Sequence, residues 1–263
     1  MHWIIRQSTL TGISVFLIFT VTSDFLAHAA PPEETDNPVI SIIIDDIGYR
    51  LKNDIRAIAL PGPLAYGIMP HAPHSGRMSE LATSKGKEII LHLPMQALNR
   101  NEFLGPGALT LNMTRKLFLN TLDMDLNAVP NVIGVNNHMG SLLTRHPGHM
   151  QWLMEAIKTH GYFYIDSLTS EQSIAAQIAK ENQVPYIRRD VFLDNEQDHA
   201  YIRGQFMELV KTARRKGSAV GIGHPNPGTI DVLMETLPNL QRYGVQIINL
   251  QEMINLRNGG ERK

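Results

Sequence analysis

The sequence contains no cysteine, and this absence excludes disulfide bonds and thiolate metal ligands. It also has no block of basic residues. Its 24 Lys and Arg are balanced by 25 Asp and Glu among 263 residues, so the formal net charge is −1. Without a basic patch the chain lacks the usual feature of a nucleic-acid-binding surface, so nucleic acid is not an expected partner. A metal site in this chain has to use histidine and carboxylate side chains.

The N-terminal segment has the features of a secretory signal peptide. Arg6 precedes the apolar stretch GISVFLIFTV, and Ala27 and Ala29 fit an A-x-A cleavage site. We therefore expect a signal peptide over residues 1–30, a polar leader over residues 31–37 and export to a bacterial periplasm. An uncleaved anchor is the alternative, but the apolar run is short for a membrane span. No stable membrane insertion is expected after cleavage.

From residue 38 onward, short apolar runs alternate with stretches of helical periodicity. Runs such as VISIII, KEIILHL and SAVGIG are bounded by Gly, Pro or Asn, as buried parallel strands are. Between them, apolar residues recur at three- and four-residue spacing, which is typical of helices. This order predicts a parallel α/β fold. Seven or eight strands favour a (β/α) barrel, in a single domain over residues 38–256 with a polar tail over residues 257–263.

Polar side chains that bind metals or transfer protons follow these predicted strands. They are Asp45, Asp46, His92, Asn136, Asn137, His138, Asp166, Asp190, Asp194 and His224. The carboxyl ends of parallel strands lie on one face of such folds, and active sites form there. Carboxylates and neutral imidazoles are suitable zinc ligands. The pattern therefore predicts a divalent metal site in which one carboxylate of the Asp pair binds the ion and the other accepts a proton.

Each of these residues also has a structural interpretation. His92 fits a core histidine that bonds a backbone carbonyl, and His138 lies in a glycine-containing turn. His224 precedes a proline and fits a turn before a helix. Asp166 and Asp194 fit helix caps as well as groups that orient a histidine or substrate.

The strand ends resemble a known family. The segments DDIG, HLPM, NNHMGS, YIDS, FLDN and IGHP occur in this order. They resemble the motifs of the divergent polysaccharide deacetylases, a YibQ-like group related to NodB-type carbohydrate esterase family 4 deacetylases. IIIDDIG is similar to the first NodB motif, a strand ending in TFDDG, and GKEIILHLPM is similar to the second motif, GHEIGNHT. The likeness extends over about residues 38–255.

The resemblance implies a deformed (β/α) barrel of about seven strands and a metal-dependent hydrolase. Its implied substrate is an acetylated cell-envelope polysaccharide that loses N-acetyl groups. Asp45 matches the family's general base, and Asp46 and His92 match metal ligands. His224 matches the general acid of the late motif.

One family ligand has no histidine counterpart in this sequence. Gln96 stands where the second motif carries another histidine, so we expect His138 to supply the third ligand for one divalent ion, with zinc as the expected metal. Asn137, Asp166 and Asp194 are expected to contact substrate or to orient other site residues. The alternative is a non-catalytic glycan- or metal-binding envelope protein with the same fold.

Overall fold

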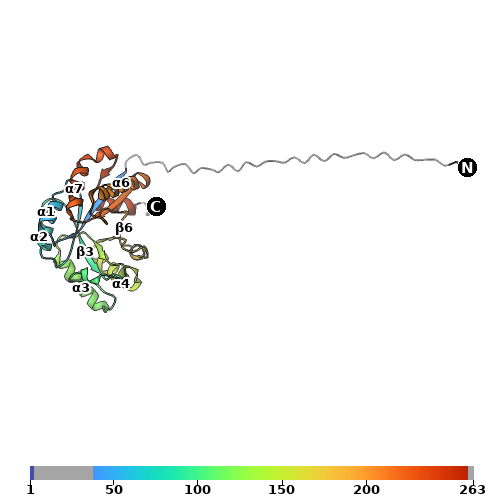
Figure 1. The fold of residues 1–263 in the computed structure, drawn as a ribbon. Coiled ribbons are helices and arrows are strands. Elements are labelled where there is room, and N and C mark those ends of the chain that lie inside the picture. The colour runs from blue at the N-terminus through green and yellow to red at the C-terminus, as the bar shows by residue number, and fades with distance from the viewer. Residues whose placement is uncertain (3–37, 260–263) are drawn as a thin grey trace. The chain divides into compact units, whose positions relative to one another are not determined.

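The computed structural model describes residues 1–2 and 38–259 of the chain. Except for Met1 and His2, the predicted signal peptide and polar leader lie outside the described residues. Within residues 38–259 strands and helices alternate, as the sequence predicts (Figure 1). In this part of the chain, no helix combines the length and apolar character needed to cross a membrane.

The strands form one parallel sheet in the order β6-β5-β4-β3-β2-β1-β8-β7, with β9 paired to β1. The described strands are β1 (Val39–Ile47), β2 (Ala65–Ile68), β3 (Glu88–Met95), β4 (Gly134–Met139), β5 (Phe163–Asp166), β6 (Tyr186–Arg188), β7 (Val191–Phe192), β8 (Ser218–Gly223) and β9 (Gln246–Ile247). Seven of them have three or more residues, whereas β7 and β9 have two each. No pairing joins β6 to β7 in the described part, so the curved sheet is an incomplete barrel. The predicted deformed barrel is confirmed.

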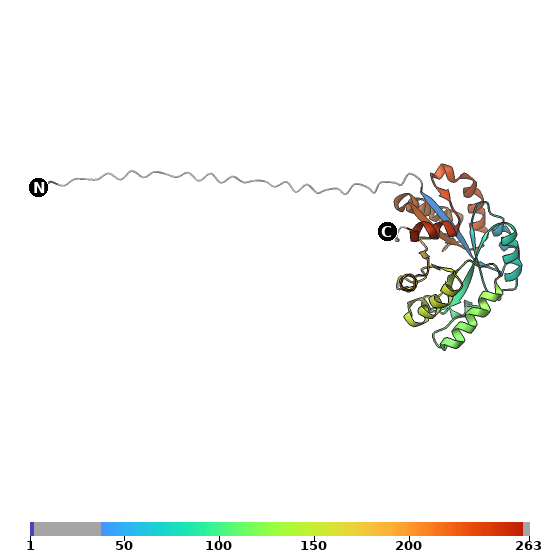
Figure 2. The ribbon, with the colours of Figure 1, turned by 180° about the vertical axis from the view of Figure 1, so that it is seen from behind.

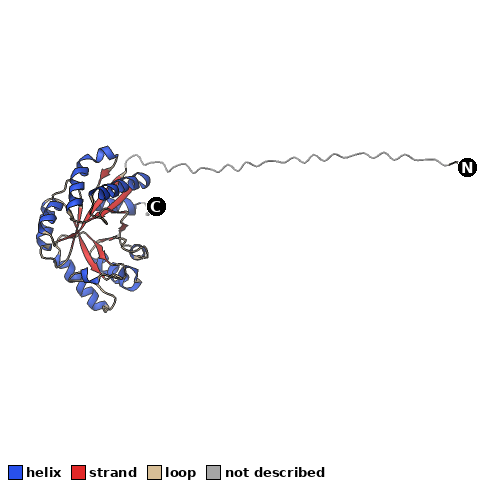
Figure 3. Cartoon of the chain, viewed as in Figure 1, coloured by secondary structure: helices blue, strands red, loops and turns tan. Residues whose placement is uncertain are grey.

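Helices surround the strands, which lie on the inside in Figure 3. They are α1 (Leu51–Ile58), α2 (Ser75–Ser84), α3 (Arg115–Ala128), α4 (Pro147–Thr159), α5 (Ala175–Glu181), α6 (His199–Lys216), α7 (Pro227–Thr236) and α8 (Leu250–Gly259), with short 3-10 helices η1 (Asn101–Phe103), η2 (Leu143–Arg145) and η3 (Leu237–Tyr243). Figures 1 and 2 show α7, α1, α2 and α3 following one another around the sheet. The longest helix, α6, is bounded by local chemistry: the Asp198 side chain accepts from two backbone N–H groups at its start, and Gly217 ends it with φ +84°.

Helix α8 corrects one predicted boundary. The expected domain end at residue 256 falls inside this helix, which continues to Gly259. Arg257 is held there because its Nη2 donates to Asp190 Oδ2 at 2.7 Å and its Nε donates to Ser218 Oγ at 3.0 Å. The first residues of the predicted polar tail therefore belong to the folded domain.

Strand β1 shows how the fold brings a carboxylate inside the barrel. Ile42 and Ile44 pack into the larger apolar core with the surrounding helices, and Ile43 packs into a smaller core with residues such as Val220. Each fully buried isoleucine stabilises the fold by about 1.5–3 kcal/mol. Because strand side chains alternate, Asp45 points to the same side as Ile43. The apolar strand thus carries its first carboxylate into the barrel interior.

Candidate functional site

The end of β1 places its two neighbouring carboxylates differently. The register between β1 and β2 shifts between Ile44 and Ile47, and Asp46 has φ +58°. This left-handed conformation costs about 1 kcal/mol for a residue with a Cβ, although aspartate tolerates it better than most. The irregularity interrupts strict alternation and re-aims Asp46. As a result Asp45 is 1% exposed, whereas the Asp46 side chain is 38% exposed at the mouth of the barrel.

Three side chains from three strands converge at this mouth. Asp46 Oδ1 lies 3.2 Å from His92 Nε2 and 3.0 Å from His138 Nδ1, and the two ring nitrogens are 3.1 Å apart. We call Asp46, His92 and His138 the ligand cluster. Ligands at about 2.0–2.2 Å from a tetrahedral zinc ion lie roughly 3.3–3.6 Å from one another. The observed separations are close to this range, so the three predicted ligands fit one divalent ion.

Hydrogen bonds behind the ligand cluster determine which ring nitrogens carry protons. His92 Nδ1 lies 2.8 Å from Asn136 Oδ1, and His138 Nε2 lies 3.2 Å from the Phe103 carbonyl oxygen. Both oxygens only accept, because the Asn136 amide nitrogen donates to Asp45. The outer nitrogens therefore donate, and in the neutral rings the inner nitrogens present lone pairs to each other and to Asp46. Such partners orient metal-binding histidines in general.

The ligand cluster is electron-rich and incompletely satisfied. Asp46 Oδ1 is buried and has no hydrogen-bond partner within the described residues. Burial acts to raise the pKa of Asp46, but its contacts with His138 and His92 hold that pKa well below the usual range. The carboxylate oxygen and the two ring nitrogens lie within 3.2 Å of one another and need a shared cation, which is either a ring proton, the source of the low pKa of Asp46, or a metal ion between neutral rings.

Asn136 links the ligand cluster to the other carboxylate. Its Nδ2 donates to both oxygens of Asp45, at 2.9 and 2.8 Å. Gly67 closes the opposite side, since a Cβ there would lie 2.0 Å from Asp45 Oδ1. Burial raises the pKa of Asp45, although the charge of His92 opposes the shift. Asp45 is thus fixed between Gly67, Asn136 and His92, directly behind the ligand cluster.

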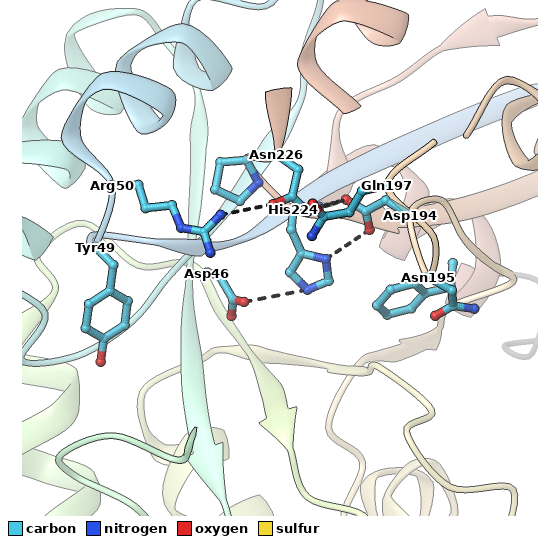
Figure 4. Close-up of a pocket in the computed structure, with 10 residues that line it drawn as sticks. Asp46, Tyr49, Arg50, Asp194, Asn195, Gln197, His224 and Asn226 are labelled. Atoms are coloured by element: carbon cyan, nitrogen blue, oxygen red, sulfur yellow. Dashed lines mark hydrogen bonds and ion pairs between the residues drawn. The ribbon is translucent and has the colours of Figure 1, made fainter. Parts of the chain in front are cut away.

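His224 lies on the other side of Asp46 and forms a second unit with Asp194. Its Nδ1 is 2.9 Å from Asp194 Oδ1, and its Nε2 is 3.8 Å from Asp46 Oδ2 (Figure 4). Thr229 Oγ1 donates to Asp194 Oδ2 at 2.6 Å, and the His224 backbone N–H donates to the same oxygen at 2.7 Å. We call His224 and Asp194 the His224 dyad.

The electrostatics of the His224 dyad favour a charged imidazole. Burial acts to lower the pKa of His224, but the hydrogen bond to Asp194 and the charge of Asp46 raise it to about 9. Burial likewise acts to raise the pKa of Asp194, and the hydrogen bond with His224 outweighs it and lowers that pKa. His224 is therefore protonated at neutral pH and able to donate from Nε2. A cavity of about 450 Å³ next to it is lined by Asp46, Arg50 and Phe192, among others.

Two predicted site residues make structural contacts instead. Asn137 Oδ1 accepts from the Ser167 backbone N–H at 2.9 Å, and its Nδ2 donates to the Met139 carbonyl oxygen at 2.7 Å. It points away from the ligand cluster because successive strand residues face opposite sides. The observed contacts of Asn137 therefore support the turn after β5 and the end of β4, and none of them is with the ligand cluster. Asn136 lies on the same side of β4 as His138, and it is Asn136 that orients His92 and Asp45 through hydrogen bonds.

Asp166 also departs from the predicted orienting role. Its Oδ1 accepts from the Leu168 backbone N–H at 2.9 Å and its Oδ2 accepts from Ser173 Oγ at 2.8 Å. It lies 3.7 Å from the Arg188 guanidinium. These contacts fix the turn after β5, as in the capping interpretation, and none of them reaches the ligand cluster or the His224 dyad.

Gln96 occupies a structural position in place of the missing family histidine. Its Oε1 accepts from the Leu111 backbone N–H at 2.8 Å, and its backbone N–H donates to the Leu109 carbonyl oxygen at 2.9 Å. Its side chain thus ties down the segment after η1. In the same region, the Phe103 carbonyl oxygen contacts His138. Gln96 therefore supplies no atom to the ligand cluster, and His138 is the third residue of that cluster.

Comparison with protein families and curated relatives identifies similar sequences. The family described as divergent polysaccharide deacetylase matches residues 42–254. An uncharacterized protein of Haemophilus influenzae is 37% identical over 211 residues, which are 80% of this chain and 75% of that protein. The uncharacterized protein YibQ of Escherichia coli is 36% identical over 201 residues, 76% of this chain. The chain spans 63% of the length of YibQ.

Solved structures share the barrel. An uncharacterized protein from Agrobacterium tumefaciens superposes with a TM-score of 0.79 at 24% identity, covering 83% of this chain and 90% of that one. A mutant, with restored enzymatic activity, of a CE4-family pseudoenzyme from Bacillus anthracis superposes with a TM-score of 0.52 at 13% identity, covering 83% and 68%. These likenesses show the fold, which is the deformed NodB-like barrel of CE4 proteins.

Proposed function

This chain belongs to the divergent polysaccharide deacetylase family, and we propose that it is a metal-dependent hydrolase that removes N-acetyl groups from a cell-envelope polysaccharide. The observation that carries this proposal is the convergence of one carboxylate oxygen and two imidazole nitrogens within 3.0–3.2 Å of one another. Two histidines and one carboxylate are a common ligand set for zinc and related ions that keep an open position. Zinc is the ion we expect.

The proposed roles follow from where each side chain lies. Asp46, His92 and His138 would hold the ion, which when bound supplies Lewis acidity for the scissile acetamide and lowers the pKa of water. His224 donates a proton to the leaving amine from Nε2, and Asp194 orients its ring. We assign the base to Asp45, because it is the carboxylate of the pair that contacts the ligand cluster from behind and because burial raises its pKa.

Acetate release from a zinc-replete protein tests the proposal directly. Soluble N-acetylglucosamine oligomers serve as substrates, and Asp46→Asn is the inactive variant. Asp231→Asn is the matched control, because Asp231 is an exposed aspartate paired with Arg56. We expect release by the wild type and the control and none by Asp46→Asn. Equal release by all three proteins would contradict the proposal.

A non-catalytic binding protein is the second candidate. Gln96 supports it, because this residue replaces a family ligand and is committed to Leu111. In that case the zinc-loaded wild type would bind acetylated oligomers, and no acetate would be released over long incubation.

We also propose that the protein acts in a bacterial periplasm after loss of residues 1–30, and that residues 38–259 form its single catalytic domain. Intact-mass measurement of the exported protein tests the first point, since a chain that starts near Ala30 is expected. A chain that retains Met1 and is found in the membrane fraction would favour the alternative of an uncleaved membrane anchor.

A further inference from the structure

The cavity next to Asp46 is lined by a positively charged side chain, that of Arg50, which has no role in the proposed chemistry. Among the described residues that line it, Arg50 is the only arginine or lysine. It immediately precedes α1 and is exposed, and Figure 4 shows its guanidinium turned toward Asn226 at the edge of the cavity. Asp46 and Asp194, the carboxylates lining the same cavity, both contact histidines.

Arg50 is anchored but not neutralised. Its Nη1 donates to Asn226 Oδ1 at 3.0 Å, and within residues 38–259 its guanidinium has no ion pair. Asp54, four residues further along the chain, accepts the backbone N–H groups of Gly48 and Arg50. By contrast, Arg203 makes two 2.9 Å contacts with Glu235. Most of the Arg50 guanidinium donors therefore have no partner within the described residues and are open to solvent or to a ligand.

Asn226, which anchors the Arg50 guanidinium, also lines the cavity. Asn226 is 7% exposed, and its Nδ2 lies 3.4 Å from Asp194 Oδ2, so its Oδ1 is directed toward Arg50. The position of the guanidinium is therefore coupled to the His224 dyad, which we propose protonates the leaving amine. A group held by Arg50 would lie in the same cavity as the reacting acetamide.

We propose that Arg50 forms an anion subsite and that the glycan substrate carries a carboxylate or phosphate close to the N-acetyl group that is removed. This inference rests on the proposed deacetylase function. A guanidinium binds such groups through two parallel hydrogen bonds, whereas neutral hydroxyls use one. A divalent cation in the ligand cluster adds positive charge to the cavity and further favours an acidic glycan.

Binding of matched acidic and neutral probes to the zinc-loaded full chain tests the subsite. The first probe is a tetrasaccharide of alternating N-acetylglucosamine and glucuronic acid, compared with its carboxyl methyl ester. The second is N-acetylglucosamine 6-phosphate, compared with N-acetylglucosamine. The first pair reports a carboxylate on a neighbouring sugar and the second a phosphate on the same sugar. Calorimetry gives the affinities, and acetate release is measured in parallel.

The variants are Arg50→Met, Arg50→Lys and the control Arg56→Met, which removes a partly exposed arginine of α1 that pairs with Asp231. We expect the wild type to favour at least one acidic probe over its neutral match by about 10- to 100-fold, the scale of a charge-assisted pair. Arg50→Met should abolish this preference, Arg50→Lys should keep part of it, and Arg56→Met should keep all of it. Thermal melts confirm that each variant is folded.

Several outcomes would overturn the subsite. They are equal affinity of the wild type for each acidic probe and its neutral match, no binding of any probe, or an equal loss for acidic and neutral probes in Arg50→Met. Acetate release from neutral tetra-N-acetylchitotetraose in these cases would leave the deacetylase proposal standing. Conversely, an Arg50-dependent preference without acetate release from any probe would support the subsite and contradict the deacetylase function.

Discussion

The ligand cluster and the His224 dyad use the same residue types at the same end of the barrel, but they differ in what their atoms leave unsatisfied. In the His224 dyad, Asp194 accepts from His224, Thr229 and a backbone N–H group, so the carboxylate is fully bonded. In the ligand cluster, Asp46 Oδ1 is buried without a hydrogen-bond partner among the described residues, and two ring nitrogens lie 3.0 and 3.2 Å from it.

This difference indicates how a carboxylate and a histidine are directed to separate tasks. A histidine whose Nδ1 donates to a carboxylate becomes a charged proton donor, as the pKa of about 9 for His224 indicates. A histidine whose outer nitrogen donates to an amide or backbone carbonyl can present the lone pair of its inner nitrogen to a metal ion. The hydrogen-bond partner behind the ring therefore distinguishes the proposed acid from the proposed metal ligands.

The largest effect is expected from Asp46→Asn, which removes the only anionic donor of the ligand cluster. The variant should stay folded, retain little zinc and lose activity to background, because an amide binds zinc poorly compared with a carboxylate. Metal analysis by mass spectrometry and acetate release check this, with Asp231→Asn as the control. Full zinc occupancy in Asp46→Asn would contradict the assignment of the ligand cluster, as opposed to the His224 dyad, as the metal site.

The next effect concerns Asp45 and His224, the proposed acid–base pair. Asp45→Asn and His224→Gln should each lower kcat by about 10²- to 10⁴-fold, the scale of general acid–base catalysis, without changing zinc content. The opposite pattern is also informative. Loss of zinc in Asp45→Asn would make Asp45 a positioning residue that acts on His92 through Asn136.

Asn136→Ala tests the hydrogen bond that keeps His92 a ligand. Removal of the amide leaves His92 Nδ1 without its acceptor and Asp45 without its donor, so zinc affinity should fall by about 10- to 100-fold, as for other groups behind metal ligands. Competition with a chelator measures this affinity. Asn137→Ala is the matched control, since its contacts support the fold on the opposite side of β4. Equal zinc affinity in the two variants would contradict the prediction.

The smallest effect is expected at Asp125, a buried carboxyl outside both regions, where burial alone changes the pH dependence of stability. Asp125 lies outside both regions, with Oδ1 2.9 Å from His71 Nε2, and burial raises its pKa to about 8. The folded state therefore keeps a proton that the unfolded chain releases near pH 4, so wild-type stability should fall as pH rises from about 4 to about 8.

Asp125→Asn lacks this titration and should gain stability relative to the wild type between pH 5 and pH 9. Each kcal/mol gained should raise Tm by about 2–4 °C in a domain of this size. Thermal melts at both pH values measure the difference, and the exposed Asp231→Asn should show no such trend. A constant difference between Asp125→Asn and the wild type would show that the Asp125 carboxyl does not titrate in this range.

The sequence by itself determined the parallel α/β class, the approximate strand count and the candidate donors. These features depend on local periodicity and on the rule that parallel strands end on one face. It was also sufficient to name His138 as a candidate ligand, and the structure places this residue beside Asp46 and His92. The alternation of β4 also contained the information that Asn136, and not Asn137, shares a side with His138.

Only the tertiary structure decided how these groups are used. Asp46 reaches the ligand cluster because of the register shift in β1 and its own positive φ. The contact of Arg50 with Asn226 joins residues 176 positions apart. Neither feature has a local pattern, because each depends on how strands and loops pack against one another. Periodicity places a side chain on a face, whereas the partners packed behind it determine its protonation, its orientation and therefore its chemistry.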